Sequence, residues 1–318
     1  MNKHLLCLTV DTDPDGLSGK VTDRRTLEWQ GLEALKTLPA EMHARPELES
    51  IPITWFIRAD GQLESILGSP SYLLEKFNCF WSEVSRNGHE LAWHPHLYRQ
   101  SNVEHEPRII SRASEAQEEL ERLWDELKDM LPATSFRNGE GWHTPETYST
   151  VESLGFRCDS TAIPNRKGAH GHPMNWAGAP NQPYFPHFTD LCADGKERGL
   201  LELPMNTWLV HAPYDAEPKL RYMNPAVHPG LFARAVQDWE KTRKFSYTDL
   251  HVWVMIFHPD EVLPGQHSDQ LYERSRTALF TNLLGFQESL QRAEVETEWV
   301  TIEKAAEFWR RSRLKQTA

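Results

Sequence analysis

The sequence predicts an α/β protein: one domain over residues 1–318, folded as a (β/α) barrel of about seven strands that resembles a TIM barrel. Two observations lead to this fold. Short apolar runs typical of buried strands alternate along the chain with segments of helical periodicity. No linker, internal repeat or low-complexity segment divides the 318 residues. An alternating order of strands and helices favours parallel pairing beneath an outer layer of helices, and one barrel can reach this length.

Seven apolar runs have the length and composition of buried strands. These runs are residues 5–10, 51–57, 90–93, 134–137, 156–159, 199–203 and 251–257. The segments with helical periodicity or helix-ending residues are 26–38, 72–86, 111–130, 145–154, 229–241, 269–292 and 301–311. Residues 160–198 are rich in Pro and Gly and lack an apolar period, so we expect long loops there. These loops and residues 211–228 are expected to shape a pocket.

Composition excludes several classes of function. The formal net charge of −12 disfavours nucleic-acid binding, although a local basic pocket remains compatible with that sum. The four cysteines are widely spaced, which predicts no disulfide. The first residues run directly into a predicted strand without a leader segment, and no stretch approaches the roughly 18 apolar residues of a spanning helix. We therefore expect a cytoplasmic protein that does not insert into membranes.

Polar side chains follow four of the predicted strands at the point where each strand ends. They are Asp11, His94, Arg137 and His258. In parallel α/β barrels the carboxyl ends of the strands lie on one face, and the chemistry of the protein is found there. This coincidence is the main argument from the residues themselves for a functional site.

Two carboxylates, Asp11 and Asp13, leave the first strand two residues apart and can face the same crevice. One carboxylate can then hold a cation while the other accepts a proton from water. Two alternatives exist for this segment. The Asp-Pro-Asp-Gly that begins at Asp13 is also good turn chemistry. The start resembles a calcium-binding EF-hand loop, but its twelfth position is Thr22 rather than Glu, and a strand precedes it.

Two histidines, His94 and His96, end the third strand with a proline between them. Neutral imidazole is a common zinc ligand, and Pro95 keeps the chain extended so that both rings can face the same side. His89 begins that strand, away from this end, so a structural role is favoured for it. The His-Gly-His that ends at His172 lies in a loop that no strand positions, and a structural role is favoured there too.

Five segments resemble, in family order, the motifs of the polysaccharide deacetylase family, also called the NodB-homology or carbohydrate esterase 4 family. They are Leu8-Thr-Val-Asp-Thr-Asp13, Gly88-His-Glu-Leu-Ala-Trp-His94, Ser135-Phe-Arg-Asn-Gly-Glu-Gly-Trp142 with its following helix, Leu200-Leu-Glu-Leu-Pro204 and Val254-Met-Ile-Phe-His258. The first of these is the Asp-x-Asp variant of its motif. Together the segments span most of the chain. The resemblance implies the distorted barrel of the glycoside hydrolase/deacetylase type.

The resemblance also implies a site. Asp13, His94 and His96 would hold a divalent metal, expected to be zinc. Asp11 would act as the base, His258 as the acid, and Arg137 would pair with Asp11 and orient it. The family places its second metal histidine four residues after the first, where this chain has a tyrosine, Tyr98. His96 is the residue that can take that place.

Aromatic rings stack well on the C–H faces of sugars, and three tryptophans are candidates for this contact: Trp93, Trp142 and Trp208. Core packing is the alternative for each of them.

The function that these features predict is metal-dependent hydrolysis of an amide, which removes an acetyl or formyl group from the nitrogen of a carbohydrate. Two alternatives remain open: hydrolysis of a non-sugar cyclic amide, and a glycan-binding protein that kept the fold and lost the metal. The expected partner is a carbohydrate or small amide rather than nucleic acid, and assembly into a homo-oligomer is left open.

Overall fold

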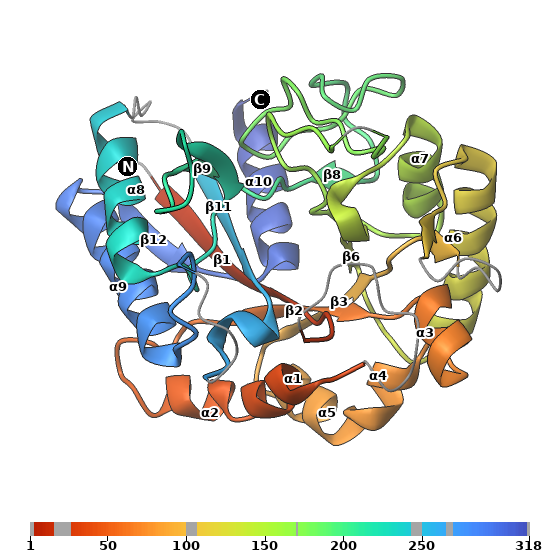
Figure 1. The fold of residues 1–318 in the computed structure, drawn as a ribbon. Helices are drawn as coiled ribbons and strands as arrows, with labels where there is room; N and C mark the ends of the chain where they lie inside the picture. Colours follow the sequence, from red (N-terminus) through yellow and green to blue (C-terminus); the bar gives the residue numbers. More distant parts are fainter. Residues whose placement is uncertain are drawn as a thin grey trace.

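The computed structural model describes residues 3–15, 27–99, 107–169, 171–242, 250–264 and 270–316. Its centre is a curled parallel sheet with the strand order β11-β1-β2-β3-β6-β7-β8 (Figure 1). These strands are β1 (Lys3–Asp11), β2 (Ile53–Arg58), β3 (Glu90–His94), β6 (Ser135–Phe136), β7 (Cys158–Asp159), β8 (Leu201–Glu202) and β11 (Leu250–Phe257). They are the seven strands that the sequence predicts, and the predicted α/β fold with a distorted barrel is confirmed, with the sheet curled into a half-barrel.

Strand β1 occupies the middle of this sheet and is almost entirely buried. Along one side it pairs with β11. Along the other side its first half pairs with β12 (Glu296–Trp299), and its second half pairs with β2. The sequence does not predict β12, because its Glu-Thr-Glu-Trp has no apolar run. At its carboxyl end β1 lies between β11 and β2, so Asp11 is inside the sheet rather than at its edge.

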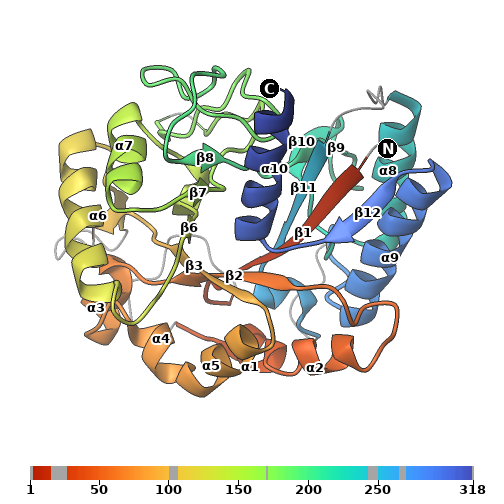
Figure 2. The same ribbon diagram turned by 180° about the vertical axis from the view of Figure 1, so that it is seen from behind.

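Ten helices are described, and Figures 1 and 2 show them packed around the outside of the sheet. They are α1 (Gln30–Leu35), α2 (Leu38–His43), α3 (Gly61–Leu67), α4 (Tyr72–Lys76), α5 (Asn78–Arg86), α6 (Ala113–Leu127), α7 (Pro145–Ser153), α8 (Pro229–Thr242), α9 (Arg276–Arg292) and α10 (Ile302–Gln316).

Several helix boundaries differ from the prediction. The predicted helix 26–38 is replaced by α1 and α2, and Pro39 lies in the first turn of α2 instead of ending a helix. Proline is tolerated there because the first turn has no N–H partner to lose. The predicted helix 72–86 is two helices that meet at Phe77. Helix α9 begins at Arg276, later than predicted, after the capping side chain of Ser275.

The segments between the main strands include two hairpins and two short 3₁₀ turns. Strands β9 (Thr207–Val210) and β10 (Lys219–Tyr222) pair antiparallel, as do β4 (Tyr98–Arg99) and β5 (Arg108–Ile109). The turns are η2 (Gly139–Gly141) and η3 (Pro259–Val262). The region 211–228, predicted as loop, therefore contains a strand. The described part of 160–198 has no named helix or strand, as predicted.

One large apolar core lies between the sheet and the helices. Trp93 of β3 is fully buried there, packs between Trp124 and Phe156, and donates its indole N–H to the Ala59 carbonyl. A smaller apolar cluster lies under β9 and α8. Across the described ranges, none of the helices is long and apolar enough to cross a membrane.

Shortening a side chain of β1 is expected to destabilise the fold strongly. Leu8 is 0% exposed, so Leu8→Ala leaves a cavity and should lower the free energy of unfolding by about 2–5 kcal/mol. Leu209→Ala is the matched control, because Leu209 is 60% exposed and its loss should change stability by less than about 0.5 kcal/mol. Urea denaturation followed by circular dichroism measures both values. Equal effects of the two substitutions would contradict the central place of β1.

Candidate metal and acid–base site

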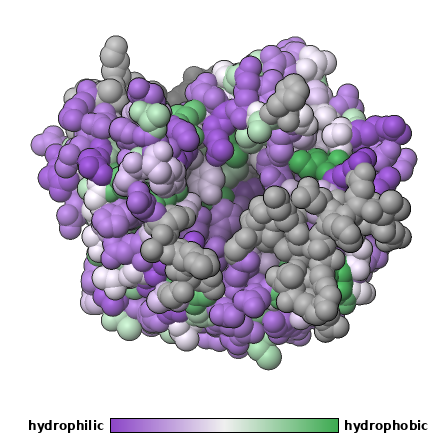
Figure 3. Space-filling view, in the orientation of Figure 1, coloured by the Kyte–Doolittle hydropathy of each residue, from purple (hydrophilic) through white to green (hydrophobic). Residues whose placement is uncertain are grey.

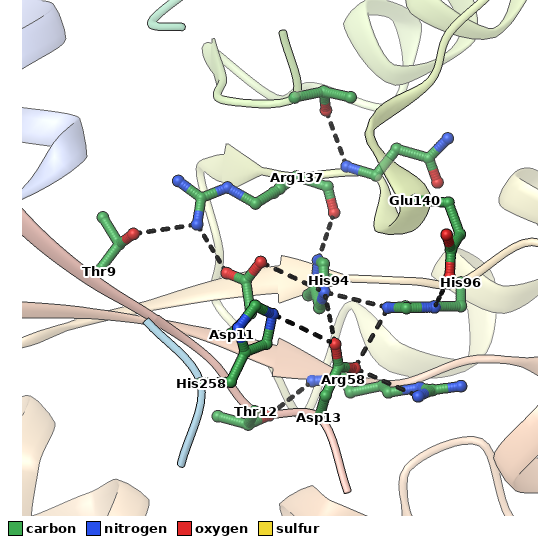
Figure 4. A network of polar contacts seen from close by, with 12 residues as sticks. Thr9, Asp11, Thr12, Asp13, Arg58, His94, His96, Arg137, Glu140 and His258 are labelled. Atoms are coloured by element: carbon green, nitrogen blue, oxygen red, sulfur yellow. Dashed lines mark hydrogen bonds and ion pairs between the residues drawn. The ribbon is translucent and has the colours of Figure 1, made fainter. Parts of the chain in front are cut away.

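The parallel sheet brings together the polar residues that end its strands. Asp11 ends β1, His94 ends β3, Arg137 follows β6, and His258 follows β11. Neighbouring parallel strands present their carboxyl ends at one edge, so residues far apart in sequence become neighbours. Figure 4 shows their side chains gathered around Asp11 and Asp13.

The segment after β1 is fixed to the neighbouring strand. The Thr12 N–H donates to the Phe56 carbonyl (3.0 Å), and the Thr12 hydroxyl accepts from the Arg58 N–H (2.9 Å). Asp11 and Asp13, on either side of Thr12, both line one cavity. Both carboxylates therefore face the cavity even if the segment that follows them forms a turn. Thr22, the twelfth position of the EF-hand alternative, lies outside the described residues.

Three side chains form a group able to hold a metal ion: Asp13, His94 and His96, whose ligand atoms lie within 4.8 Å of one another. The two Nε2 atoms are 3.2 Å apart, and His96 Nε2 is 3.2 Å from Asp13 Oδ1. Tetrahedral ligands with bonds of about 2.0–2.1 Å lie about 3.3 Å from each other, so this donor set fits a metal such as zinc.

The orientation of His94 also suits a ligand. Its Nδ1 is 2.9 Å from the carbonyl oxygen of Arg137. A proton on Nδ1 satisfies that carbonyl and leaves the lone pair of Nε2 directed toward Asp13 and His96. Metal-binding histidines are commonly fixed in this way through their second nitrogen.

His96 is the third candidate donor, and it takes the place of the histidine that the family has where this chain has Tyr98. Tyr98 instead donates its hydroxyl to Glu140 Oε1 (2.6 Å), and its ring stacks on that of His96. The same Glu140 oxygen is 3.8 Å from His96 Nδ1, which has no hydrogen-bond partner among the described residues. Gly139 is required beneath the imidazole, since an added Cβ would lie 2.2 Å from His96 Cδ2. Tyr98 therefore packs against His96 and binds Glu140, and it is not one of the three candidate metal donors.

The pair predicted between Asp11 and Arg137 is present and buried. Arg137 Nη1 donates to Asp11 Oδ1 (2.6 Å) and to the Thr9 hydroxyl (3.0 Å). Its Nε and Nη2 donate to the backbone carbonyl and the hydroxyl of Ser160. The guanidinium also lies 3.9 Å above the centre of the Phe56 ring. These contacts fix one oxygen of Asp11 and leave the other, Oδ2, 3.6 Å from His94 Nε2.

A second buried arginine, Arg58 at the end of β2, was missed by the sequence analysis. Its Nη1 is 3.2 Å from Asp13 Oδ1, and its Nε donates to Asp60 (2.8 Å). Burial would raise the pKa of Asp13, but His96, His94 and Arg58 together hold that pKa well below its usual range. The signal was available, because a charged residue ending a predicted strand is the pattern that identified Arg137.

His258 faces the same group from β11, with its Nε2 3.7 Å from Asp13 Oδ2. Its Nδ1 is 3.3 Å from Glu261 Oε1, and its backbone N–H donates to the other oxygen of Glu261. Burial alone would lower the pKa of His258, but the carboxylate of Glu261, with Asp13 and Asp11, raises it to about 10. The ring therefore carries a proton at neutral pH.

These residues form the floor of a cavity of about 370 Å³. Figure 3 shows this face hollowed, with hydrophilic residues inside the hollow. Residues of the 160–198 region line the cavity, as expected, and the 211–228 region contributes Tyr222. His172 also lines it and lies 3.6 Å from Glu140 Oε2, a position that the loop sequence did not reveal.

The structure does not bring the three candidate tryptophans to this cavity. Trp93 is 0% and Trp142 is 1% exposed, both within the main core. Trp208 is half-buried and packs edge-on against Phe232. None of the three is among the cavity-lining residues, so their placement matches the core-packing alternative.

No protein-family model and no curated protein sequence matches the chain. Among solved structures, a protein from Parabacteroides distasonis, provisionally assigned as a glycoside hydrolase/deacetylase, aligns with a TM-score of 0.59 at 14% identity, over 98% of this chain and 71% of that one. A provisionally assigned polysaccharide deacetylase from Mycobacterium smegmatis aligns with a TM-score of 0.48 at 14% identity, over 98% and 92% of the two chains.

A third structure, from Bordetella bronchiseptica, is provisionally assigned as a polysaccharide deacetylase involved in O-antigen biosynthesis. It aligns with a TM-score of 0.39 at 17% identity, over 91% of this chain and 90% of that one. At such identities the likeness to the first of these structures establishes the fold alone. The chain thus has the fold of the glycoside hydrolase/deacetylase type, with an Asp-His-His group able to hold a metal.

Removal of one histidine is expected to abolish metal binding. His94→Ala deletes a donor whose position is fixed by a backbone contact, so calorimetric titration with zinc should lose its signal, and zinc should no longer raise the melting temperature. Tyr98→Phe is the control, because it removes the hydroxyl that contacts Glu140 and leaves all three donors in place. Undiminished zinc binding by His94→Ala would refute the assignment of that ligand.

Proposed function

We propose that this protein is a metal-dependent amide hydrolase that removes an acetyl or formyl group from the nitrogen of a carbohydrate. The proposal rests on one observation: two carboxylates that lie close together, Asp11 and Asp13, have different partners. Asp13 lies with the two histidines, whereas Asp11 is held by Arg137. One carboxylate is thus available as a ligand and the other as a base, and a histidine lies across from both.

Asp13, His94 and His96 would hold the metal. When bound there, a divalent cation supplies a Lewis acid that lowers the pKa of water and polarises a carbonyl group. Arg58 Nη1, 3.2 Å from Asp13 Oδ1, helps to orient that carboxylate, and His96, His94 and Arg58 together keep the pKa of Asp13 low and the carboxylate ionised.

Asp11 is assigned as the general base. Arg137 fixes one of its oxygens, and the other oxygen faces the Asp-His-His group. In that position Asp11 accepts a proton from the water that attacks the amide carbon. Arg137 is buried and hydrogen-bonded on three sides, so it acts by orienting Asp11 rather than by touching the substrate.

His258 is assigned as the general acid. Glu261 fixes its Nδ1, so its Nε2 points into the cavity. The protonated ring donates to the amide nitrogen as the carbon–nitrogen bond breaks. Water is consumed, and the products are a free amine and acetate or formate.

Substitution of the base should stop turnover and spare the metal. Asp11→Asn keeps the shape of the side chain but removes its basic oxygen, and positioned proton transfer contributes about 10²–10⁴-fold to such rates. We expect kcat to fall by at least about a hundredfold with zinc affinity retained. Asp129→Asn, at an exposed position just after α6, is the matched control.

Amine release is measured on N-acetylated and N-formylated amino sugars together with a cyclic imide. Preference for the imide would favour the non-sugar alternative. Unchanged turnover in Asp11→Asn would remove Asp11 as the base.

The pH dependence should report His258. An acid must be protonated to act, and the pKa of His258 is raised to about 10, so turnover should fall as the pH rises through that pKa. His258→Asn should lower kcat and abolish this alkaline decline. Glu261→Gln removes the carboxylate that raises the pKa of His258, so it should move the decline toward neutral pH. An unaltered profile in both variants would contradict the assignment.

A further inference from the structure

A hairpin whose two arms are residues 165–168 and 174–176 forms one wall of the cavity. Backbone hydrogen bonds join Asn165 to Trp176, Trp176 to Arg166, and Gly168 to Met174, each at 2.8 Å. The indole N–H of Trp176 donates to the Gly141 carbonyl (2.6 Å), which ties this hairpin to the turn that carries Glu140. The side chains on the hairpin are therefore held over the site by fixed backbone rather than by a free loop.

Two cations of this hairpin, Arg166 and Lys167, line the cavity. Arg166 is half-buried, and Tyr222 of strand β10 lines the same cavity. Within the described ranges, neither side chain has a carboxylate within ion-pair distance. They differ in this respect from Arg58 and Arg137, the two arginines at the floor of the cavity, which contact Asp13 and Asp11.

The carboxylates of the cavity already have partners. Asp11 pairs with Arg137, Asp13 pairs with Arg58, and Glu140 accepts from Tyr98 and lies beside His172. Four arginine and lysine side chains line the cavity against three carboxylates, so the lining is positive in a chain whose net charge is −12. A cleft of one sign concentrates ligands of the opposite sign, and a guanidinium binds carboxylate or phosphate oxygens through paired N–H groups.

The geometry points to an anion subsite formed by Arg166 and Lys167, which binds a phosphate or carboxylate group on the acylated amine. This inference rests on the proposed function, because it places the amide at the Asp-His-His group and the anion at the hairpin. The substrate class becomes an N-acylated sugar that carries a negative charge, in place of a neutral glycan. A cavity of about 370 Å³ is of a size that suits such a small molecule.

The test compares binding of three sugars that differ in charge: N-acetylglucosamine, its 1-phosphate, and the corresponding N-acetylated uronic acid. Calorimetry is carried out on the zinc-loaded protein and again with a chelator, because the chelator removes any direct contact of phosphate with metal. We expect the charged sugars to bind about tenfold or more tightly than the neutral one in both conditions. The two charged sugars distinguish phosphate from carboxylate as the preferred group.

Arg166→Met keeps the apolar length of the side chain and should remove this preference, while Arg166→Lys should retain part of it. Arg234→Met, on the exposed face of α8, removes the same charge elsewhere and is the control. With a charged substrate, Arg166→Met should raise KM about tenfold at unchanged kcat. With the neutral sugar, KM should not change.

Equal binding of charged and neutral sugars by the unaltered protein would overturn the inference. So would a loss in Arg166→Met that is equal for all three sugars, because that pattern indicates a structural role. The two proposals fail separately. A preference for charged sugars that depends on Arg166, without any amine release, would refute the hydrolase and leave the anion subsite standing.

Discussion

The ion pair between Arg137 and Asp11 is the interaction on which the arrangement of the site depends. Both groups are buried, and moving two charges out of water costs several kcal/mol for each ion unless their hydrogen-bonding capacity is met. Here the guanidinium reaches β1 through Thr9 and Asp11, the segment after β7 through Ser160, and the face of Phe56 in β2. One side chain thus sets the spacing of several strand ends.

That pairing also explains how two carboxylates so close in sequence can have different chemistry. Asp11 faces a cation on one side and keeps one oxygen toward the cavity, whereas Asp13 is surrounded by His94, His96 and Arg58. These neighbours hold the pKa of Asp13 low, so its carboxylate stays ionised. Arg137 is thus paired with Asp11, whereas Asp13 and Asp60 share Arg58, and neither hairpin cation has a carboxylate within ion-pair distance in the described part of the chain.

The turn over residues 138–142 couples the floor of the cavity to its wall. Glu140 adopts a positive φ of 58°, a conformation that is costly for a residue with a side chain and is kept where surrounding contacts enforce it. Tyr98 and His172 contact its carboxylate, and Gly139 leaves room for the ring of His96. The carbonyl of Gly141 accepts a hydrogen bond from the indole N–H of Trp176 in the hairpin. A change in this turn would therefore move both a metal-binding candidate and the wall that carries Arg166.

The sequence by itself determined the seven parallel strands and the residues at their ends, because apolar runs bounded by polar or turn residues are local signals. Asp11, His94, Arg137 and His258 were found in this way, and their convergence follows from parallel topology alone. Strand β12 escaped this reasoning, since its pairing with β1 is a long-range contact without a local apolar pattern.

Only the tertiary structure decided which residues surround those ends. It placed His96 within 3.2 Å of both Asp13 and His94, placed Arg58 against Asp13, buried Trp93 and Trp142 in the core, and folded the hairpin of Arg166 over the cavity. These outcomes depend on packing between segments far apart in the chain, and no periodicity within a single segment records them.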